Sequence, residues 1–207
     1  MSGLVRAGAP PVILASGSAA RAALLQAAGI PFMALPAPVD EASLREALRA
    51  EGMAAEPAAI ALAELKAHHV AARAPAEAIV LGADQILEIE GDWLEKPGDR
   101  ETAARQLRRL RGQRHRLVSA VVAFRGGARV WHDADVATLS MRPFSEEFLA
   151  HYLDAAGPPI LGCVGAYQIE GLGAQLMARV EGAYATVLGL PLLPLLQFLR
   201  DQGVLAA

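Results

Sequence analysis

Short apolar runs alternate along this chain with longer stretches that have the composition of helices. Most runs are a few residues long and end at glycine, proline or a polar residue, which is typical of buried strands. Strands that alternate with helices, together with hairpins, predict an α/β fold with a mixed sheet. The predicted strands cover residues 11–16, 31–35, 78–81, 85–90, 93–94, 117–124, 128–141 and 164–169, and the predicted helices cover 19–28, 41–51, 57–73, 99–111, 145–155 and 190–201.

The size and composition of the chain exclude several classes of protein. Its 207 residues suffice for one domain, 1–207, and 54% hydrophobic against 20% charged residues exclude a disordered chain. With 19 Lys and Arg against 22 Asp and Glu, the net charge of −3 disfavours a dedicated nucleic-acid binder. No apolar run reaches the roughly 18 residues of a membrane span. The single cysteine, Cys163, cannot form an intramolecular disulfide, which fits a reducing, cytoplasmic compartment.

Small residues surround the predicted start of the first helix, where Ser16 and Ser18 precede Arg21. Ser18 is placed to cap the helix, whose free N–H groups and positive dipole end suit a phosphate. Arg21, on the first turn, could bind an anion through two of its guanidinium nitrogens. An ordinary capped helix with a solvated arginine explains the same residues, so this segment alone leaves both interpretations open.

The most specific candidate for chemistry is Asp84, which follows a predicted strand that breaks at Gly82. In open α/β sheets, ligands bind beyond the carboxyl ends of the strands, where an aspartate can bind Mg²⁺ or act as a base. Lys96, about a dozen residues later, could return to the same place. Glu41 stands at a predicted helix start and could be only a dipole partner, and Lys66 could be only a snorkelling surface lysine.

The remaining motifs favour structural roles. Gly171 and Gly173 lack the third glycine of a dinucleotide-binding fingerprint, since Leu176 stands in its place. The five histidines form no zinc-ligand spacing with Cys163, so we expect surface or packing roles for them and a small core position for the cysteine. The basic helix over 99–111 is interpreted as a solvated face, with nucleic-acid contact as the minor alternative.

Several of these segments form an ordered set that covers nearly the whole chain. The set comprises Leu14-Ala-Ser-Gly-Ser-Ala-Ala-Arg21-Ala-Ala-Leu-Leu25, Val39-Asp-Glu41, Leu62-Ala-Glu-Leu-Lys66-Ala, Gly82-Ala-Asp84-Gln85, Lys96-Pro97, Gly165-Ala-Tyr-Gln-Ile-Glu170-Gly and Val187-Leu-Gly-Leu-Pro191-Leu. In this order the segments resemble the motifs of the Maf family of nucleoside-triphosphate pyrophosphatases. Each motif alone is weak, whereas the ordered set is highly specific.

The resemblance implies a fold and an activity. It implies two lobes around an active-site cleft, commonly in a homodimer. It also implies hydrolysis of a nucleoside triphosphate between its α and β phosphates, with a divalent metal such as Mg²⁺ or Mn²⁺. The monophosphate and pyrophosphate would be the products.

The chain departs from the family pattern where the substrate is concerned. The family's S-P-R-R is Ser18-Ala-Ala20-Arg21 here, so the proline and the first arginine are absent, and no aromatic ring stands at Ala20. Gln85 and Glu170 stand where the thymidine and uridine branch has threonine and glutamine, which brings the chain closer to the 7-methyl-GTP branch. A carboxylate accepts the N–H donors of a positively charged methylated purine better than an amide does. We therefore expect a methylated purine triphosphate as substrate.

A mechanism follows from these residue types. A triphosphate carries about four negative charges, so its hydrolysis needs charge neutralisation and an activated water. Asp84 and Glu41 could hold Mg²⁺, and Asp84 is assigned as the base, with Glu41 able to exchange roles. Lys66, Lys96 and Arg21 could offset the phosphate charge. The alternative is a non-catalytic nucleotide-binding regulator of cell division and septum formation, which would not need a base.

Overall fold

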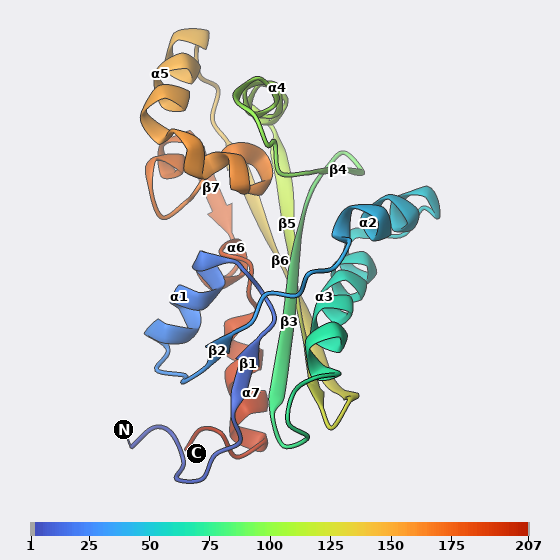
Figure 1. The fold of residues 1–207 in the computed structure, drawn as a ribbon. Helices are drawn as coiled ribbons and strands as arrows, with labels where there is room; N and C mark the ends of the chain where they lie inside the picture. The colour runs from blue at the N-terminus through green and yellow to red at the C-terminus, as the bar shows by residue number, and fades with distance from the viewer. Residues whose placement is uncertain (1–2, 207) are drawn as a thin grey trace. The chain divides into compact units, whose positions relative to one another are not determined.

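The computed structural model describes residues 3–206, which form a sheet with helices packed on it (Figure 1). The strands are β1 (Val12–Leu14), β2 (Met33–Ala34), β3 (Ile79–Ile89), β4 (Asp92–Leu94), β5 (Arg114–Arg125), β6 (Ala128–Met141) and β7 (Met177–Glu181). The α-helices are α1 (Ala19–Ala27), α2 (Glu41–Ala50), α3 (Ala55–Ala71), α4 (Arg100–Leu110), α5 (Glu146–Ala156), α6 (Tyr184–Val187) and α7 (Leu192–Asp201). Short 3₁₀ turns are η1 (Pro158–Gly162), η2 (Val164–Ala166) and η3 (Leu172–Leu176).

Within the described residues the sheet has seven strands in the order β2-β1-β3-β5-β6-β7, and β4 pairs with β3 outside that path. β1 is parallel to β2 and to β3, with Ile13 opposite Met33 on one side and Val80 on the other. The pairs β3–β4 and β6–β7 are antiparallel. The α/β class and the mixed sheet predicted from the sequence are confirmed.

The described residues divide into two compact units, and the long strands β3, β5 and β6 contribute residues to both. Unit 1 comprises the chain up to Gln85, Ser119–Asp135 and the part from Leu188 onward. One face of its sheet packs against α1 and α7 in an apolar cluster, and α3 lies along β3 on the other face (Figure 1). Because helices cover both faces, β1 and the first half of β3 are continuous buried runs.

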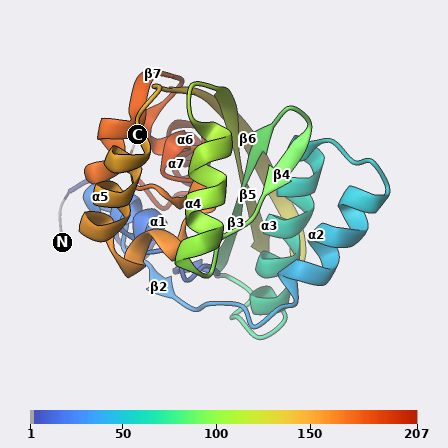
Figure 2. The same ribbon diagram turned by 90° about the horizontal axis from the view of Figure 1, so that it is seen from above.

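Unit 2 comprises Ile86–Val118 and Val136–Val187. Its core brings Leu87 of β3 together with Leu107 of α4 and Leu149 of α5. The helices α4 and α5 lie side by side in both ribbon views (Figures 1 and 2). The part of β6 in this unit alternates between half-buried and buried residues, as in a sheet with one covered face.

Side-chain caps fix several helix starts that were predicted from the sequence. Ser18, Asp99 and Ser145 each accept a hydrogen bond from a backbone N–H in the first turn of their helix. Each cap satisfies a donor that has no partner within the helix. The predicted boundaries of α1, α4 and α5 therefore agree with the structure to within a residue or so.

Two predicted strand assignments are wrong. β3 does not break at Gly82 but continues to Ile89, so the predicted runs 78–81 and 85–90 belong to one strand. Residues 164–169, predicted as a strand, instead form η2 and irregular backbone, because Gly165 and Ala166 have φ angles of 77° and 59°. Left-handed backbone at consecutive residues cannot continue a strand. β7 and α6 were not predicted.

Candidate active site

Asp84 lies inside β3 and is almost completely buried, with 3% of its surface exposed. It is therefore within the sheet rather than beyond the end of a strand, where it was predicted. Both carboxylate oxygens have cationic partners: Lys66 Nζ donates to Oδ1 over 2.7 Å, and Arg45 Nη2 donates to Oδ2 over 3.1 Å. Desolvating a carboxylate costs several kcal/mol, so these paired cations are what permit Asp84 to be buried.

Gly82 is the reason that Lys66 reaches this carboxylate. A Cβ atom on Gly82 would overlap the carbonyl oxygen of Ala63 and lie 2.7 Å from the amide nitrogen of Ala67. Because glycine has no side chain, the backbone of α3 packs directly on the backbone of β3. Lys66 is then 6% exposed, which excludes the alternative of a solvated surface lysine.

The helix α2 supplies two further members of the same cluster. Glu41, in its first turn, has its side chain 38% exposed and its Oε2 2.8 Å from Lys66 Nζ. Arg45 follows four residues later, on the same face of the helix, and is 9% exposed. We call Glu41, Arg45, Lys66 and Asp84 the charge ring; its contacts run from Glu41 through Lys66 and Asp84 to Arg45, so carboxylates and cations alternate.

Arg45 was not predicted as a site residue. It stands in the segment Leu44-Arg-Glu-Ala-Leu-Arg49, whose charged residues are typical of a solvated helix face. The spacing of four from Glu41 was the available signal, since residues i and i+4 share a face of a helix. That spacing became informative once Glu41 was itself a candidate.

Arg21 is buried in unit 1 and holds three of its segments together. It donates to the carbonyl oxygen of Gly189 (2.8 Å), to Ser16 Oγ (3.1 Å) and to the carbonyl oxygen of Ala83 (3.0 Å). Burial lowers the pKa of Arg21, while the charges of Asp84 and Glu41 oppose that fall and the charge of Arg45 adds to it. The predicted contact of Arg21 with an anion stays a prediction, because these three bonds go to protein atoms.

Three other predicted residues of unit 1 have defined positions. Ser18 caps α1 and accepts a hydrogen bond from the backbone N–H of Arg21 over 3.4 Å. Gln85 follows Asp84 on β3, and its Nε2 donates to Ser119 Oγ over 3.0 Å. Ala20 is half-buried in the first turn of α1. Their contacts with substrate stay predictions.

The remaining predicted residues, Lys96 and Glu170, are exposed and belong to unit 2. Both influence the pKa of the Cys163 thiol. Burial raises this pKa, and the charge of Glu170 adds to the rise, whereas a hydrogen bond with Gln168 and the charge of Lys96 oppose it. Lys96 and Glu170 therefore lie in one neighbourhood of unit 2. A thiol with a raised pKa is a poor nucleophile, as predicted for Cys163, but the residue is half-buried and not in the predicted core position.

The segment that leads to Glu170 is held in a strained turn. Ala166, a residue that rarely adopts positive φ, has a φ of 59°. Its carbonyl accepts a hydrogen bond from Tyr152 over 3.1 Å, and the hydroxyl of the buried Tyr167 lies 2.7 Å from His115 Nε2. Burial raises the pKa values of both tyrosines and lowers that of His115 to about 4. The groups that hold this turn are therefore neutral near pH 7.

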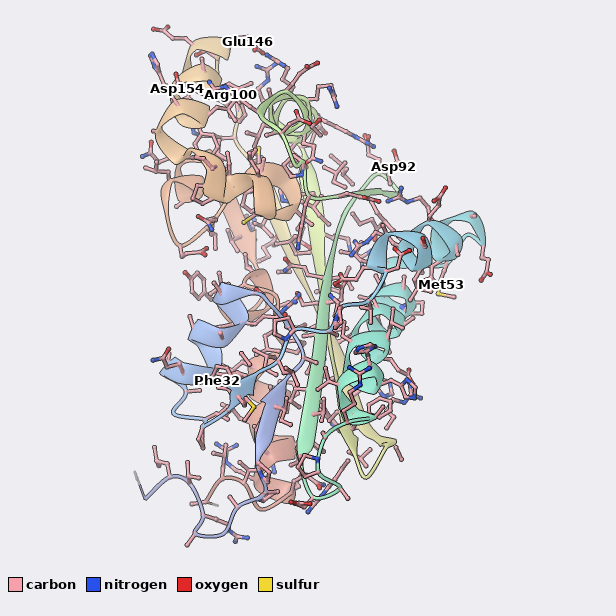
Figure 3. All side chains as sticks on the ribbon, in the orientation of Figure 1. Phe32, Met53, Asp92, Arg100, Glu146 and Asp154 are labelled. Carbon is pink, nitrogen blue, oxygen red and sulfur yellow. The ribbon has the colours of Figure 1, made fainter. Side chains whose placement is uncertain are left out.

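The basic helix α4 is a solvated, ion-paired face, as its interpretation predicted. Arg108 and Arg111 bind the carboxylate of Glu146 at the start of α5, and Arg109 binds Asp92 of β4. Figure 3 shows Glu146 and Asp92 near the outer ends of these elements. These cations are already paired within unit 2.

Two carboxylates of unit 1, those of Glu41 and Asp84, have the chemistry of Mg²⁺ ligands. Within residues 3–206 no group of three or more His, Cys, Asp or Glu side chains is arranged to hold a metal. Glu41 and Asp84 nevertheless share the ammonium group of Lys66, at 2.8 and 2.7 Å, so two carboxylates surround one cation position. Mg²⁺ in nucleotide enzymes is commonly held by one or two carboxylates, with phosphates and waters as its other ligands.

Among the helices of the described residues, none combines the length and hydropathy of a membrane span.

Comparisons with known proteins agree over almost the whole chain. Residues 11–202 match the family model described as "Maf-like protein". A "Nucleoside triphosphate pyrophosphatase" of Rhodospirillum rubrum is 51% identical over 205 residues, which cover 99% of each chain. A protein of the same name from Paramagnetospirillum magneticum is 53% identical over 193 residues, 93% of this chain and 99% of the relative. Another, from Granulibacter bethesdensis, is 47% identical over 194 residues, 94% of this chain and 98% of the relative.

Proposed function

This chain belongs to the Maf family, and from that premise we propose that its charge ring serves the hydrolysis of a nucleoside triphosphate between the α and β phosphates. The protein is a nucleoside-triphosphate pyrophosphatase. The observation that carries the assignment of the site is the burial of Asp84 between Lys66 and Arg45, next to the more exposed Glu41. Burying several charged groups together costs free energy through desolvation, and a role in binding a charged substrate accounts for that cost.

The chemistry divides between the members of the ring and the predicted phosphate ligands. Asp84 and Glu41 would hold Mg²⁺, which when bound neutralises phosphate charge. The side chain of Glu41 is 38% exposed, so water reaches this carboxylate. We therefore assign Glu41 as the base that accepts the proton of the attacking water, and Asp84 as the buried carboxylate that helps to hold the metal. This division exchanges the roles first given to the two residues. Lys66 and Lys96 would offset the charge that develops on the phosphates.

The base of the substrate is proposed to be a methylated purine. Glu170 is exposed at the end of the strained turn, where its carboxylate is accessible to a ligand. Gln85, on β3 beside Asp84, is the second residue that separates this chain from the thymidine and uridine branch. A 7-methylguanine ring is a cation with N–H donors, so a carboxylate complements it in both charge and hydrogen bonding.

Several expectations from the resemblance extend this proposal. They are a single domain over 1–207, a cleft between two lobes, a homodimer and a cytoplasmic location. The alternative of a non-catalytic regulator of septum formation is not favoured, because the similar proteins are named as pyrophosphatases and the carboxylates Glu41 and Asp84 are both present.

The experiment that tests the proposed function is hydrolysis of a panel of nucleotides in H₂¹⁸O with Mg²⁺. We expect pyrophosphate release, with ¹⁸O in the nucleoside monophosphate, because water attacks the α-phosphorus. Chelation of the metal should abolish release. Orthophosphate as the first product, or ¹⁸O in the pyrophosphate, would contradict the assigned bond, and the absence of hydrolysis with every nucleotide would contradict the function.

A further inference from the structure

Arg45 is a buried cation whose hydrogen-bonding capacity is only partly used. Its Nη2 donates to Asp84 Oδ2 over 3.1 Å, and its side chain is 11% exposed. Nη1 is fully buried, and among the described residues no atom accepts a hydrogen bond from it. A buried donor without a partner costs free energy, so the pairing of Arg45 with Asp84 is an incomplete arrangement that a better acceptor can replace.

The other buried guanidinium of unit 1, that of Arg21, has protein acceptors for its Nε and Nη1. Arg21 donates to Gly189, Ser16 and Ala83, and these bonds hold three chain segments together. Turning these nitrogens of Arg21 toward a phosphate would break bonds to three protein acceptors. Within residues 3–206, Arg45 has one carboxylate partner and an Nη1 without an acceptor, so it can change partners at lower cost.

The charge balance of the ring also supports an exchange of partners by Arg45. Glu41 and Asp84 carry two negative charges and Lys66 and Arg45 carry two positive charges, so the ring is neutral without ligands. A metal ion at Asp84 would lie close to the positive charge of Arg45, whose Nη2 donates to Oδ2, so the two cations compete for this carboxylate. A metal–triphosphate complex supplies both a cation for Asp84 and anionic oxygens for Arg45, so both groups would keep a partner in the exchange.

We propose that Arg45 is a substrate-binding residue that neutralises Asp84 in the free protein and passes to a phosphate of the metal–nucleotide complex. The inference rests on the proposed function and adds to it a residue and an exchange of partners. Arg45 then lowers the affinity of the nucleotide-free protein for the metal, because it competes for Asp84, and raises the affinity for the metal–nucleotide complex. These opposite effects on two ligands separate the proposal from a purely structural ion pair.

The test measures two equilibria in wild type, R45M and R45K, with R49M as the matched control on an exposed position of the same helix. The first is binding of Mn²⁺ to the nucleotide-free protein, followed by the paramagnetic resonance signal of free Mn²⁺. The second is binding of an α,β-methylene nucleoside triphosphate with Mg²⁺, followed by calorimetry. We expect R45M to bind Mn²⁺ roughly fivefold more tightly, because a neighbouring positive charge is removed. We expect it to bind the analogue about tenfold more weakly, because a charge-assisted hydrogen bond is lost.

R45K should recover at least part of the analogue affinity, since lysine also binds phosphate as a point charge, and R49M should match wild type. Binding of Mn²⁺ by R45M that is no tighter than in wild type would overturn the exchange, and unchanged binding of the analogue would overturn the substrate contact. Should R45M fail to fold, R45Q in the same two measurements gives the same decision. Wild-type pyrophosphate release is measured alongside, so failure of the proposed function is seen separately from failure of the role of Arg45.

Discussion

The charge ring of unit 1 and the turn around Ala166 in unit 2 are both built from buried polar groups, but they are held in opposite ways. In the ring, Asp84 is balanced by the charges of Lys66 and Arg45. In the turn, Tyr167 and His115 form a hydrogen bond between groups that are neutral near pH 7. Desolvating an ion costs several kcal/mol, whereas a neutral hydrogen bond contributes about 1 kcal/mol net.

This difference indicates that the charge ring serves the reaction and that the turn around Ala166 has a structural role. A turn that needs only to be rigid is held by neutral partners, which persist over a wide range of pH. A site that binds a highly charged ligand contains ionised side chains, which are paired with one another until the ligand binds. Substitutions in the ring should therefore act chiefly on turnover, and those in the turn chiefly on stability or on the choice of substrate.

The largest effect is expected for Asp84→Asn. The amide keeps the shape but removes the charge, so kcat/KM should fall by about 10³-fold or more. Arg45 also loses its carboxylate, so Tm should fall. The measurement is pyrophosphate release at saturating Mg²⁺, well below Tm, with Glu88→Gln on the same strand as control. Turnover within a few-fold of wild type would remove Asp84 from the mechanism.

The two lysines sharpen the comparison, since Lys66 belongs to the ring and Lys96 is exposed in unit 2. Lys66→Ala and Lys96→Ala should each weaken transition-state binding by roughly 2–4 kcal/mol if both meet phosphate. Steady-state kcat/KM values and Tm are measured for both variants. A kcat/KM for Lys96→Ala equal to that of wild type would show that Lys96 is a solvated surface lysine without a role in turnover.

His115 gives the comparison a pH dependence. Its pKa is about 4 in the folded protein, below the ordinary value of 6.5. The unfolded chain therefore binds a proton at a pH where the folded protein does not. Its contribution to stability is complete above pH 6.5, falls as the pH drops from 6.5 to 4, and is constant below that. Between pH 7 and 4.5, wild type should lose about 2–3 kcal/mol more free energy of unfolding than His115→Gln.

Urea denaturation at the two pH values measures this difference. Glutamine has no titration in the range and can keep a polar contact with Tyr167, so the comparison isolates the imidazole. Parallel loss of stability in the two proteins would show that His115 titrates normally in the fold.

The smallest effect is expected for Glu170→Gln, which should reduce the preference for 7-methyl-GTP by about 1–3 kcal/mol without lowering Tm. Values of kcat/KM for 7-methyl-GTP, GTP, TTP and UTP in wild type and variant measure it, with the exposed Glu147→Gln as control. A wild-type preference of about tenfold or more for TTP or UTP would contradict the branch assignment and leave the pyrophosphatase activity intact.

The sequence predicted the alternation of strands and helices well, because caps such as Ser18 and Ser145 and apolar periodicity are local signals. The grouping of Asp84 with Lys66 and Glu41 came from the resemblance to a family, since residues 18 and 43 positions away along the chain carry no spacing signal. In the structure Lys66 contacts both of these carboxylates.

What could not be predicted has a physical reason in each case. Glycine after a short apolar run is typical of a strand end, but Gly82 instead allows α3 to pack closely on β3. That packing joins residues distant in sequence, so the local pattern does not indicate it. Ala166 adopts positive φ because Tyr152 and Tyr167 hold it there, and no local preference of alanine indicates that conformation. Arg45 resembles a solvated arginine until the burial of its partner is known.

The close approach at Gly82 also gives a meaning to the abundance of alanine in α3. Ala58, Ala59, Ala63 and Ala67 are completely buried, and Ala63 and Ala67 lie where a Cβ on Gly82 would have to go. The methyl group of Ala67 faces Gly82 directly and so helps to set the distance between helix and strand. A larger residue at Ala67 would lift the helix and draw the ammonium of Lys66 away from the carboxylate of Asp84. The low tolerance of Ala67 to substitution is thus expected to match that of the charged residue it helps to position.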